Sequence, residues 1–145
     1  MTNHAGAKSL LTVVRAPALL DESAANAVGT GVDMVGYDRV RFIVQIGAMV
    51  NGSTLDAHVI EDSISNMTNG TNITGAALVQ IANTKNNSVQ IIDVHRPSKR
   101  YVAVSLNAGT ANVTLISVLA ERFPGTGTTP RSQGANDQYV AVQAN

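Results

Sequence analysis

The sequence contains no cysteine and no tryptophan, and only 3% of its 145 residues are aromatic. Without cysteine it can form neither a disulfide framework nor a thiolate metal site. Charged residues make up 14% of the chain, against about 25% in an average globular domain, and the formal net charge is zero. A neutral, charge-poor surface has no long-range attraction for nucleic acid or anionic membranes, and it does little to prevent association.

The sequence also lacks long hydrophobic runs. No stretch of 18 apolar residues is present, so no membrane-spanning helix is predicted. The apolar stretch from Leu10 to Leu20 is interrupted by Arg15 and Pro17, which is not the pattern of a secretory signal. We therefore expect synthesis in a cytoplasm and no membrane partner.

What the sequence does have is one β-branched, apolar run after another between Arg39 and Phe123, separated by turns rich in Asn, Gly, Ser and Thr. In the clearest run, apolar and polar residues alternate, which predicts a strand with one buried face. Strands at a spacing of roughly 8–12 residues are typical of a sandwich or barrel. We predict an all-β fold, an antiparallel β-sandwich of jelly-roll type with about eight strands. The alternating apolar residues of the clearest run are Val40, Phe42, Val44 and Ile46.

Two local features refine this prediction. Asn51 and Gly52 both accept positive φ and predict a turn, so the runs 39–49 and 55–61 are expected to form an antiparallel hairpin. Pro17 cannot donate to a strand ladder, which makes the first strand an edge strand or ends it there. The region 19–37 is left undetermined.

The chain divides into three parts. Residues 1–8 are small and polar and are predicted to be an N-terminal arm, and residues 9–123 form the β-sandwich domain. Residues 124–145 are predicted to be a C-terminal arm that ends in a short strand over Gln138–Gln143. Two alternatives stay open for that strand: it reaches another subunit, or it folds back on the edge of its own sheet.

The possible catalytic or metal-binding residues are not arranged as an active site or a metal site requires. Asp56 and His58, like Asp93 and His95, are two residues apart and can share one strand face, but no third metal ligand has a predictable position. Neighbouring Glu61 and Asp62 would point to opposite faces of a strand, so they are interpreted as a solvated turn rather than a carboxylate pair. We predict no enzyme activity, no cofactor and no metal site.

Two segments are candidates for contact with a partner. The basic turn that contains Arg96, Lys99 and Arg100 either meets an acidic patch on a partner or is simply solvated. Three charges beside one aromatic residue are a small footprint for nucleic acid, so no nucleic-acid partner is expected. The C-terminal arm supplies the other candidate interface residues, which are Arg131, Tyr139, Val140 and Val142.

The order of these segments resembles a known family. From about Leu10 to Pro124 the chain is similar to the small β-sandwich cement, or head-decoration, proteins of tailed double-stranded DNA phages, and most of all to the jelly-roll cement proteins of some short-tailed phages. The similarity lies in the succession of strands and in a basic-Tyr-Val segment. The segments that carry it are 39–48, 55–61, 75–78, 89–94, 99–104 and 113–120.

The resemblance implies a structural virion protein that is made in the host cytoplasm and bound to the outer capsid surface. Its expected partners are the major capsid protein and further copies of itself, in a dimer or trimer. The family has no active-site residues to transfer. Two other functions remain open, a tail or baseplate β-sandwich and a carbohydrate-binding module. The scarcity of aromatic side chains disfavours the latter.

Overall fold

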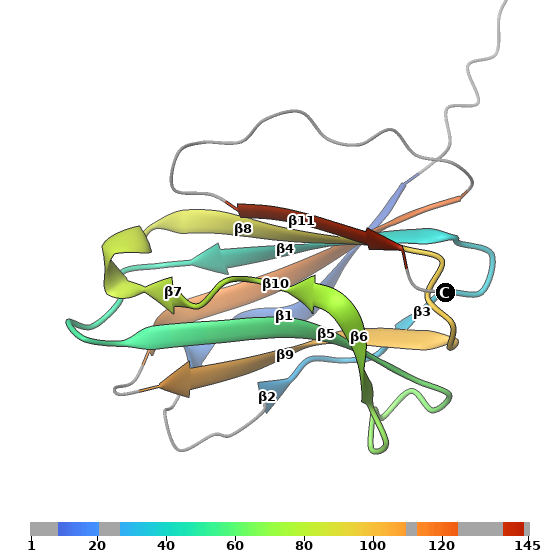
Figure 1. Ribbon diagram of the computed structural model, residues 1–145, viewed down its shortest axis with the longest axis horizontal. Helices are drawn as coiled ribbons and strands as arrows, with labels where there is room; N and C mark the ends of the chain where they lie inside the picture. The colour runs from blue at the N-terminus through green and yellow to red at the C-terminus, as the bar shows by residue number, and fades with distance from the viewer. Residues whose placement is uncertain (1–8, 21–26, 110–112, 125–137, 144–145) are drawn as a thin grey trace, which may run out of the picture.

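A computed structural model describes residues 9–20, 27–109, 113–124 and 138–143, which fold into two facing β-sheets (Figure 1). No α-helix occurs among these residues, and the one short 3₁₀ helix spans Asn83–Lys85. The strands are β1 (Leu10–Leu20), β2 (Ala27–Val28), β3 (Val32–Asp33), β4 (Arg39–Ile46), β5 (Thr54–Asp62), β6 (Thr71–Ala77), β7 (Ile81–Ala82), β8 (Ser88–His95), β9 (Tyr101–Gly109), β10 (Val113–Phe123) and β11 (Gln138–Gln143).

The strand order confirms the predicted jelly roll. The first sheet has the order β1-β10-β4-β8-β11, and the second has β2-β9-β5-β6, with β3 also paired to β9 and β7 to β5. One long antiparallel hairpin can be followed through four successive ladders, which are β1·β10, β2/β3·β9, β4·β8 and β5·β6/β7. Two further ladders, β10·β4 and β9·β5, close this hairpin into a roll of two layers.

The core lies between the two sheets, where the predicted alternation is realised. Val40, Phe42, Val44 and Ile46 of β4 are all at most 4% exposed. They belong to one continuous cluster with inward-facing residues of the second sheet, such as Val59 of β5. The strands β8 and β9 are buried on both faces, since consecutive residues such as those around Asp93 and Ala103 are inaccessible. The other outer faces and the turns at the two ends remain for interaction with a partner.

The predicted hairpin between 39–49 and 55–61 is wrong. The turn itself forms, with Gly52 at φ +81° and the Ser53 N–H donating to the Val50 carbonyl at 3.0 Å. However, β4 lies in the first sheet and β5 in the second. Residues 47–53 are longer than a two-residue hairpin loop, and they carry the chain across the roughly 10 Å that separates packed sheets.

The first strand is an edge strand, as the sequence predicts. Among the described strands β1 pairs only with β10, and its register shifts three times between Val13 and Leu20, the stretch that holds Pro17. Proline lacks the N–H that a two-sided ladder would need, so an irregular edge strand accommodates it.

The terminal strand folds back on the edge of its own sheet, which is the second of the two alternatives left open by the sequence. β11 spans the predicted residues and pairs with β8 of its own chain, at the edge of the first sheet. It runs parallel to β8, which departs from the expected all-antiparallel arrangement. Val142 packs against the core, and its Cγ2 would lie 3.4 Å from a Cβ placed on Gly75 of β6. β11 therefore lies along the open side of the roll.

Candidate functional site

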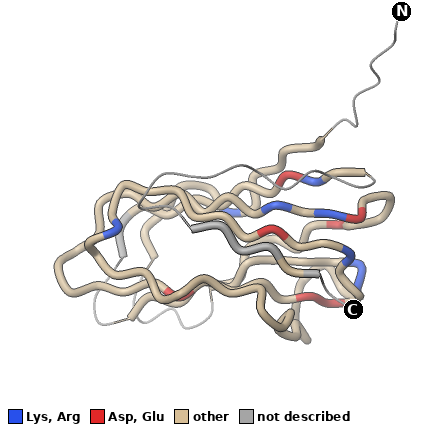
Figure 2. Tube along the Cα trace, turned by 45° about the horizontal axis from the view of Figure 1, so that its top comes forward, with Lys and Arg blue, Asp and Glu red and all other residues tan. Residues whose placement is uncertain are grey.

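The charged side chains of the described residues gather at one end of the sandwich (Figure 2). We call this the charged end; it comprises the turns 33–38, 61–70 and 95–100 and the strand residues beside them. Outside it, the described residues hold only three charges, Arg15, Asp56 and Lys85. The charges of the charged end are Asp33, Asp38, Arg39, Arg41, Glu61, Asp62, Asp93, Arg96, Lys99, Arg100, Glu121 and Arg122.

A buried ion pair anchors this end in the first sheet. Arg39 of β4 binds both carboxylate oxygens of Asp93 in β8, with its Nε 2.7 Å from Oδ1. Both side chains are nearly inaccessible, at 2% and 0% exposure. Arg41 lies opposite Asp93 in the ladder and bridges it to Glu121 of β10, at 3.5 Å from each carboxylate. The network thus crosses three adjacent strands.

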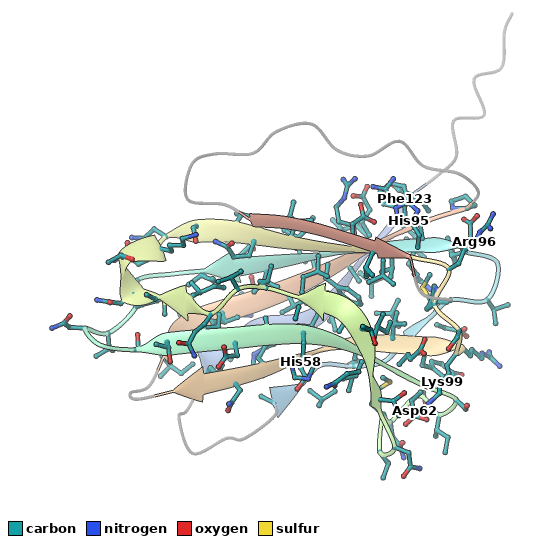
Figure 3. All side chains as sticks on the ribbon, viewed as in Figure 1. His58, Asp62, His95, Arg96, Lys99 and Phe123 are labelled. Atoms are coloured by element: carbon teal, nitrogen blue, oxygen red, sulfur yellow. The ribbon has the colours of Figure 1, made fainter. Side chains whose placement is uncertain are left out.

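An aromatic ring and a histidine complete the network. The guanidinium carbons of Arg39 and Arg41 lie 4.9 and 5.2 Å from the centre of the Phe123 ring, within range of cation–π attraction. His95 Nε2 is 3.7 Å from Asp93 Oδ1. Phe123 and His95 lie at this same end, as Figure 3 shows. Two arginines facing two carboxylates leave the network close to neutral.

A second pair links the sheet edge to the basic turn. Arg100 donates from Nε and Nη2 to the two carboxylate oxygens of Asp33, at 3.0 and 2.8 Å. The hydrogen bond from Arg100, helped by the Val35 N–H, lowers the pKa of Asp33 from 3.8 to about 2. The pKa of Arg100 is correspondingly raised by Asp33. Both side chains are half-exposed, so this pair orients the turn more than it stabilises the core.

Glu61 and Asp62 were interpreted as a solvated turn, and that interpretation is wrong, because they are only 9% and 3% exposed. Glu61 accepts hydrogen bonds from the main-chain N–H groups of Ser98 and Lys99 at 2.8 and 3.2 Å. Asp62 accepts from the N–H groups of Asn69 and Ile64 at 2.8 and 3.2 Å. Each carboxylate holds one loop in place.

These contacts also set the protonation state of Asp62. Burial opposes the charged form of its carboxylate, but hydrogen bonds from the main-chain N–H groups of Asn69, Ile64 and Ser63 outweigh it and lower its pKa. The sequence signal that was missed is the position of both acids at a strand end directly before a long, polar loop, where unpaired loop N–H groups need acceptors.

The basic turn is largely occupied by contacts within the chain. Lys99 Nζ donates to the Thr71 hydroxyl at 2.9 Å, and Arg100 is paired with Asp33. Arg96 is exposed and has φ +50°, and its side chain makes no hydrogen bond or ion pair with the described residues. A shallow depression of about 420 Å³ lies between this turn and the turn 34–38. An interface role for the three basic residues stays a prediction.

The candidate residues of the C-terminal arm are only partly described. Arg131 lies outside the described residues, as do the side chains of Tyr139 and Val140. The main chains of Tyr139 and Val140 pair with Ile91 and Ile92 of β8. Val142 is half-buried against the core, so within this chain it contributes to the sandwich itself.

The two Asp–His pairs do not assemble a larger cluster. Asp56 accepts from the Gln80 amide at 3.2 Å, and His58 lies near the middle of the sandwich in Figure 3. Among the described residues no group of three or more His, Cys, Asp or Glu could hold a metal ion. Nor does any helix in the described part of the chain have the length and apolarity to cross a membrane.

The opposite end of the sandwich carries few charges among the described residues. We call it the uncharged end; it comprises the turns 47–53 and 78–87 and the residues near Leu115 in β10. Lys85 is the one charged residue of these segments within the described part of the chain, and the Asp56 carboxylate lies beside them, 3.2 Å from the Gln80 amide nitrogen. The exposed apolar side chains there are Val50, Val79 and Leu115, at 46%, 77% and 55% exposure.

Main-chain hydrogen bonds tie the segments of the uncharged end together. The Asn87 N–H donates to the Gly47 carbonyl at 3.0 Å, and the Gly47 N–H donates to the Leu115 carbonyl at 2.9 Å. The Asn83 amide also donates to the Asn51 side-chain oxygen at 3.2 Å. The end is therefore a cross-linked surface rather than a set of independent loops.

A third feature is an apolar row on edge strand β1. Leu10, Leu11, Val13 and Leu19 are 44%, 57%, 60% and 70% exposed. Arg15 is the only charged residue of the strand, and its guanidinium donates to the Leu19 carbonyl at 3.2 Å. Leu11 and Val13 share one face of the strand, and exposed apolar residues along an edge strand are typical of a surface that meets another protein.

Comparison with known proteins identifies the fold. No protein-family profile matches the chain, and no curated protein matches it in sequence. The crystal structure of PBSX exported protein XepA superposes with a TM-score of 0.57 at 16% identity, over 92% of this chain. The chain spans only 42% of the length of XepA.

A second solved structure is similar over nearly its whole length. The SPBc2 prophage-derived protein YomS superposes with a TM-score of 0.50 at 8% identity, over 79% of this chain and 92% of its own. At such low identity the two likenesses concern the architecture. This chain therefore shares the β-sandwich fold of XepA and YomS.

Proposed function

We propose that the chain is a structural protein of a tailed double-stranded DNA phage virion, and that it binds the outer capsid surface as a cement protein that stabilises contacts between major capsid subunits. The observation that carries this proposal is the apolar row on β1, where four large aliphatic side chains stay exposed in a chain with zero net charge. Such a surface favours association with other subunits.

The fold comparisons support the same proposal. One similar structure is named as prophage-derived, and the other as an exported protein of PBSX. A jelly roll offers rigid sheets that place an edge strand and two sets of turns in fixed positions. A cement protein needs such a rigid module, because it must contact more than one neighbour at once.

The test uses the purified full-length chain and capsids assembled from the major capsid protein encoded in the same genome. We expect co-sedimentation with the capsids and a higher temperature of shell disruption when the chain is present. Capsids that neither bind the chain nor gain heat stability would contradict the proposal, as would a genome with no capsid gene. Binding to tails alone would move the role to the tail or baseplate.

The matched variant is Val13→Lys, which places a charge in the apolar row at a position that is 60% exposed. Because the side chain is already in water, the fold should be retained. We expect weaker self-association or weaker capsid binding than for the control Val28→Lys, whose position on β2 is 39% exposed.

A further inference from the structure

We propose that two copies of the chain exchange their terminal strands, so that β11 of one copy fills the strand slot of the other. The strand slot is the open side of the roll between β8 and β6, which would be the edge strands of the two sheets without β11. Within one chain it is filled by β11, which contacts both of these strands (Figure 1). This inference goes beyond the proposed function, because it names a second copy of the chain as a partner.

The strand slot accepts an uncharged strand. Its wall in the first sheet is β8, whose main chain pairs with β11 in a parallel ladder over the residues 90–95. Its wall in the second sheet is β6, where Gly75 has φ +82° and no side chain. A Cβ placed on Gly75 would lie 3.4 Å from the Cγ2 of Val142, and Val142 also packs against the hydrophobic core. The slot therefore recognises a strand by its main chain and by an aliphatic side chain.

The connection from β10 does not confine β11 to its own chain. β10 ends at Phe123, which is level with His95 of β8, because both pair with the same residue of β4. β11 begins at Gln138, opposite Gln90 of β8. These two points are about 17 Å apart along the strands and about 14 Å across them, which gives a separation of about 22 Å. The fourteen residues 124–137 can span about 50 Å, so the slot of a neighbouring copy is also within reach.

An exchanged strand makes the same contacts as a strand that stays in its own chain. The ladder with β8 and the contact of Val142 with Gly75 are identical whichever copy supplies the strand. Exchange of an identical element is therefore a low-cost route to a dimer. Because β11 itself fills the slot, the sequence of the occupant is known, and the partner is a second copy.

Concentration decides between the two arrangements. A short flexible connection holds a strand near its own slot at an effective concentration of about 1 mM. The strand of another copy competes when its concentration approaches that value. Zero net charge means that no long-range repulsion keeps two copies apart. Many copies bound side by side on one surface, as in the proposed function, would reach such a local concentration.

The test uses two full-length variants with one cysteine each, since the chain has none of its own. Gln143 of β11 lies opposite His95 of β8, so the variants are His95→Cys and Gln143→Cys. Paired residues of neighbouring strands are close enough for a disulfide. The two variants are unfolded together in urea, refolded as a mixture and oxidised. A disulfide between positions 95 and 143 then requires β11 of one copy in the slot of the other.

Two controls accompany the mixture. The double variant His95→Cys/Gln143→Cys shows whether the two thiols join within one chain. In a second mixture Gln138→Cys replaces Gln143→Cys; Gln138 pairs with Gln90, at the other end of β11 from position 143. Circular dichroism and thermal unfolding establish that each variant keeps the fold.

Peptide mass spectrometry measures the disulfide between positions 95 and 143. We expect it in about a tenth or more of the chains at about 1 mM protein, and roughly tenfold less at about 10 μM. The mixture with Gln138→Cys should give roughly tenfold less than the mixture with Gln143→Cys at about 1 mM. The double variant should form the disulfide within its own chain at both concentrations.

Two results would overturn strand exchange. One is a mixture with Gln143→Cys that links no more often than the mixture with Gln138→Cys, while the double variant does form its disulfide. The other is a double variant that forms no disulfide, because β11 then does not lie on β8. The assay contains no capsids, so a negative result here and a failure to bind capsids are separate findings.

Discussion

At the scale of single residues, the chain uses most of its charges to hold its own loops and strands. Arg39 and Asp93 form a buried pair, Glu61 and Asp62 bind loop N–H groups, and Arg100 is fixed by Asp33. The sequence did not reveal these partners, because residues such as Arg39 and Asp93 are 54 positions apart and meet only through the ladder between β4 and β8.

The buried pair predicts a large effect of removing one partner. Asp93→Ala should lower the free energy of unfolding by about 3–5 kcal/mol, because it leaves the guanidinium of Arg39 buried without that carboxylate. Urea denaturation followed by circular dichroism measures this. The control Asp56→Ala removes a half-buried carboxylate bonded to Gln80 and should cost less than about 1 kcal/mol. Equal costs for the two variants would contradict the role of the buried pair.

The paired carboxylates also predict acid sensitivity. The pKa of Asp33 is about 2 in the folded chain against 3.8 for the free group, so its charged form stabilises the fold at neutral pH. That contribution falls as the pH drops from about 4 towards 2, because the unfolded chain takes up the proton first. Asp62, whose pKa is also lowered, acts in the same direction.

Asp33→Asn tests this at acid pH. The variant should lose less stability than the unmodified chain between pH 5 and pH 2, as measured by thermal unfolding at a series of pH values. Identical pH profiles for the two proteins would show that the Asp33–Arg100 pair does not contribute.

At the scale of elements, the sequence predicted strands well and connections poorly. Periodicity located the strand with Val40, Phe42, Val44 and Ile46, and also the short strand Gln138–Gln143. It did not show that the chain changes sheet at 47–53, because a turn such as Asn51-Gly52 looks the same whether the next strand pairs locally or crosses to the other layer. Only long-range pairing, here β5 with β9, decides that.

The position of β11 predicts a stabilising role for the terminal strand. Deleting 138–145 should leave the sandwich folded but lower its free energy of unfolding by about 1 kcal/mol or more, or roughly 2–4 °C in Tm, because β8 loses its parallel partner and the core loses Val142. Hydrogen exchange of the β8 amides should become faster. A control chain that lacks only 144–145 should behave like the full chain.

Unchanged exchange in β8 after the longer deletion would have a specific meaning. It would show that β11 does not occupy the β8 edge in the free chain, and that the strand is available to another subunit, which was the first of the two alternatives drawn from the sequence.

At the scale of the whole molecule, composition predicted a charge-poor protein, but not where its charges lie. The jelly-roll topology brings the ends of β3, β5, β8 and β10 to one end of the sandwich (Figure 1). Nearly all charges of the described residues lie at that end (Figure 2). The apolar row on β1 is likewise a property of the folded chain. The proposed cement function depends on this surface.

Cryo-electron microscopy of capsids incubated with the full-length chain tests this account most directly. We predict ordered density for a β-sandwich on the outer capsid surface, with the edge strand β1 against a neighbouring subunit. Capsids that show no such density, or a bound sandwich whose β1 edge faces solvent, would contradict it.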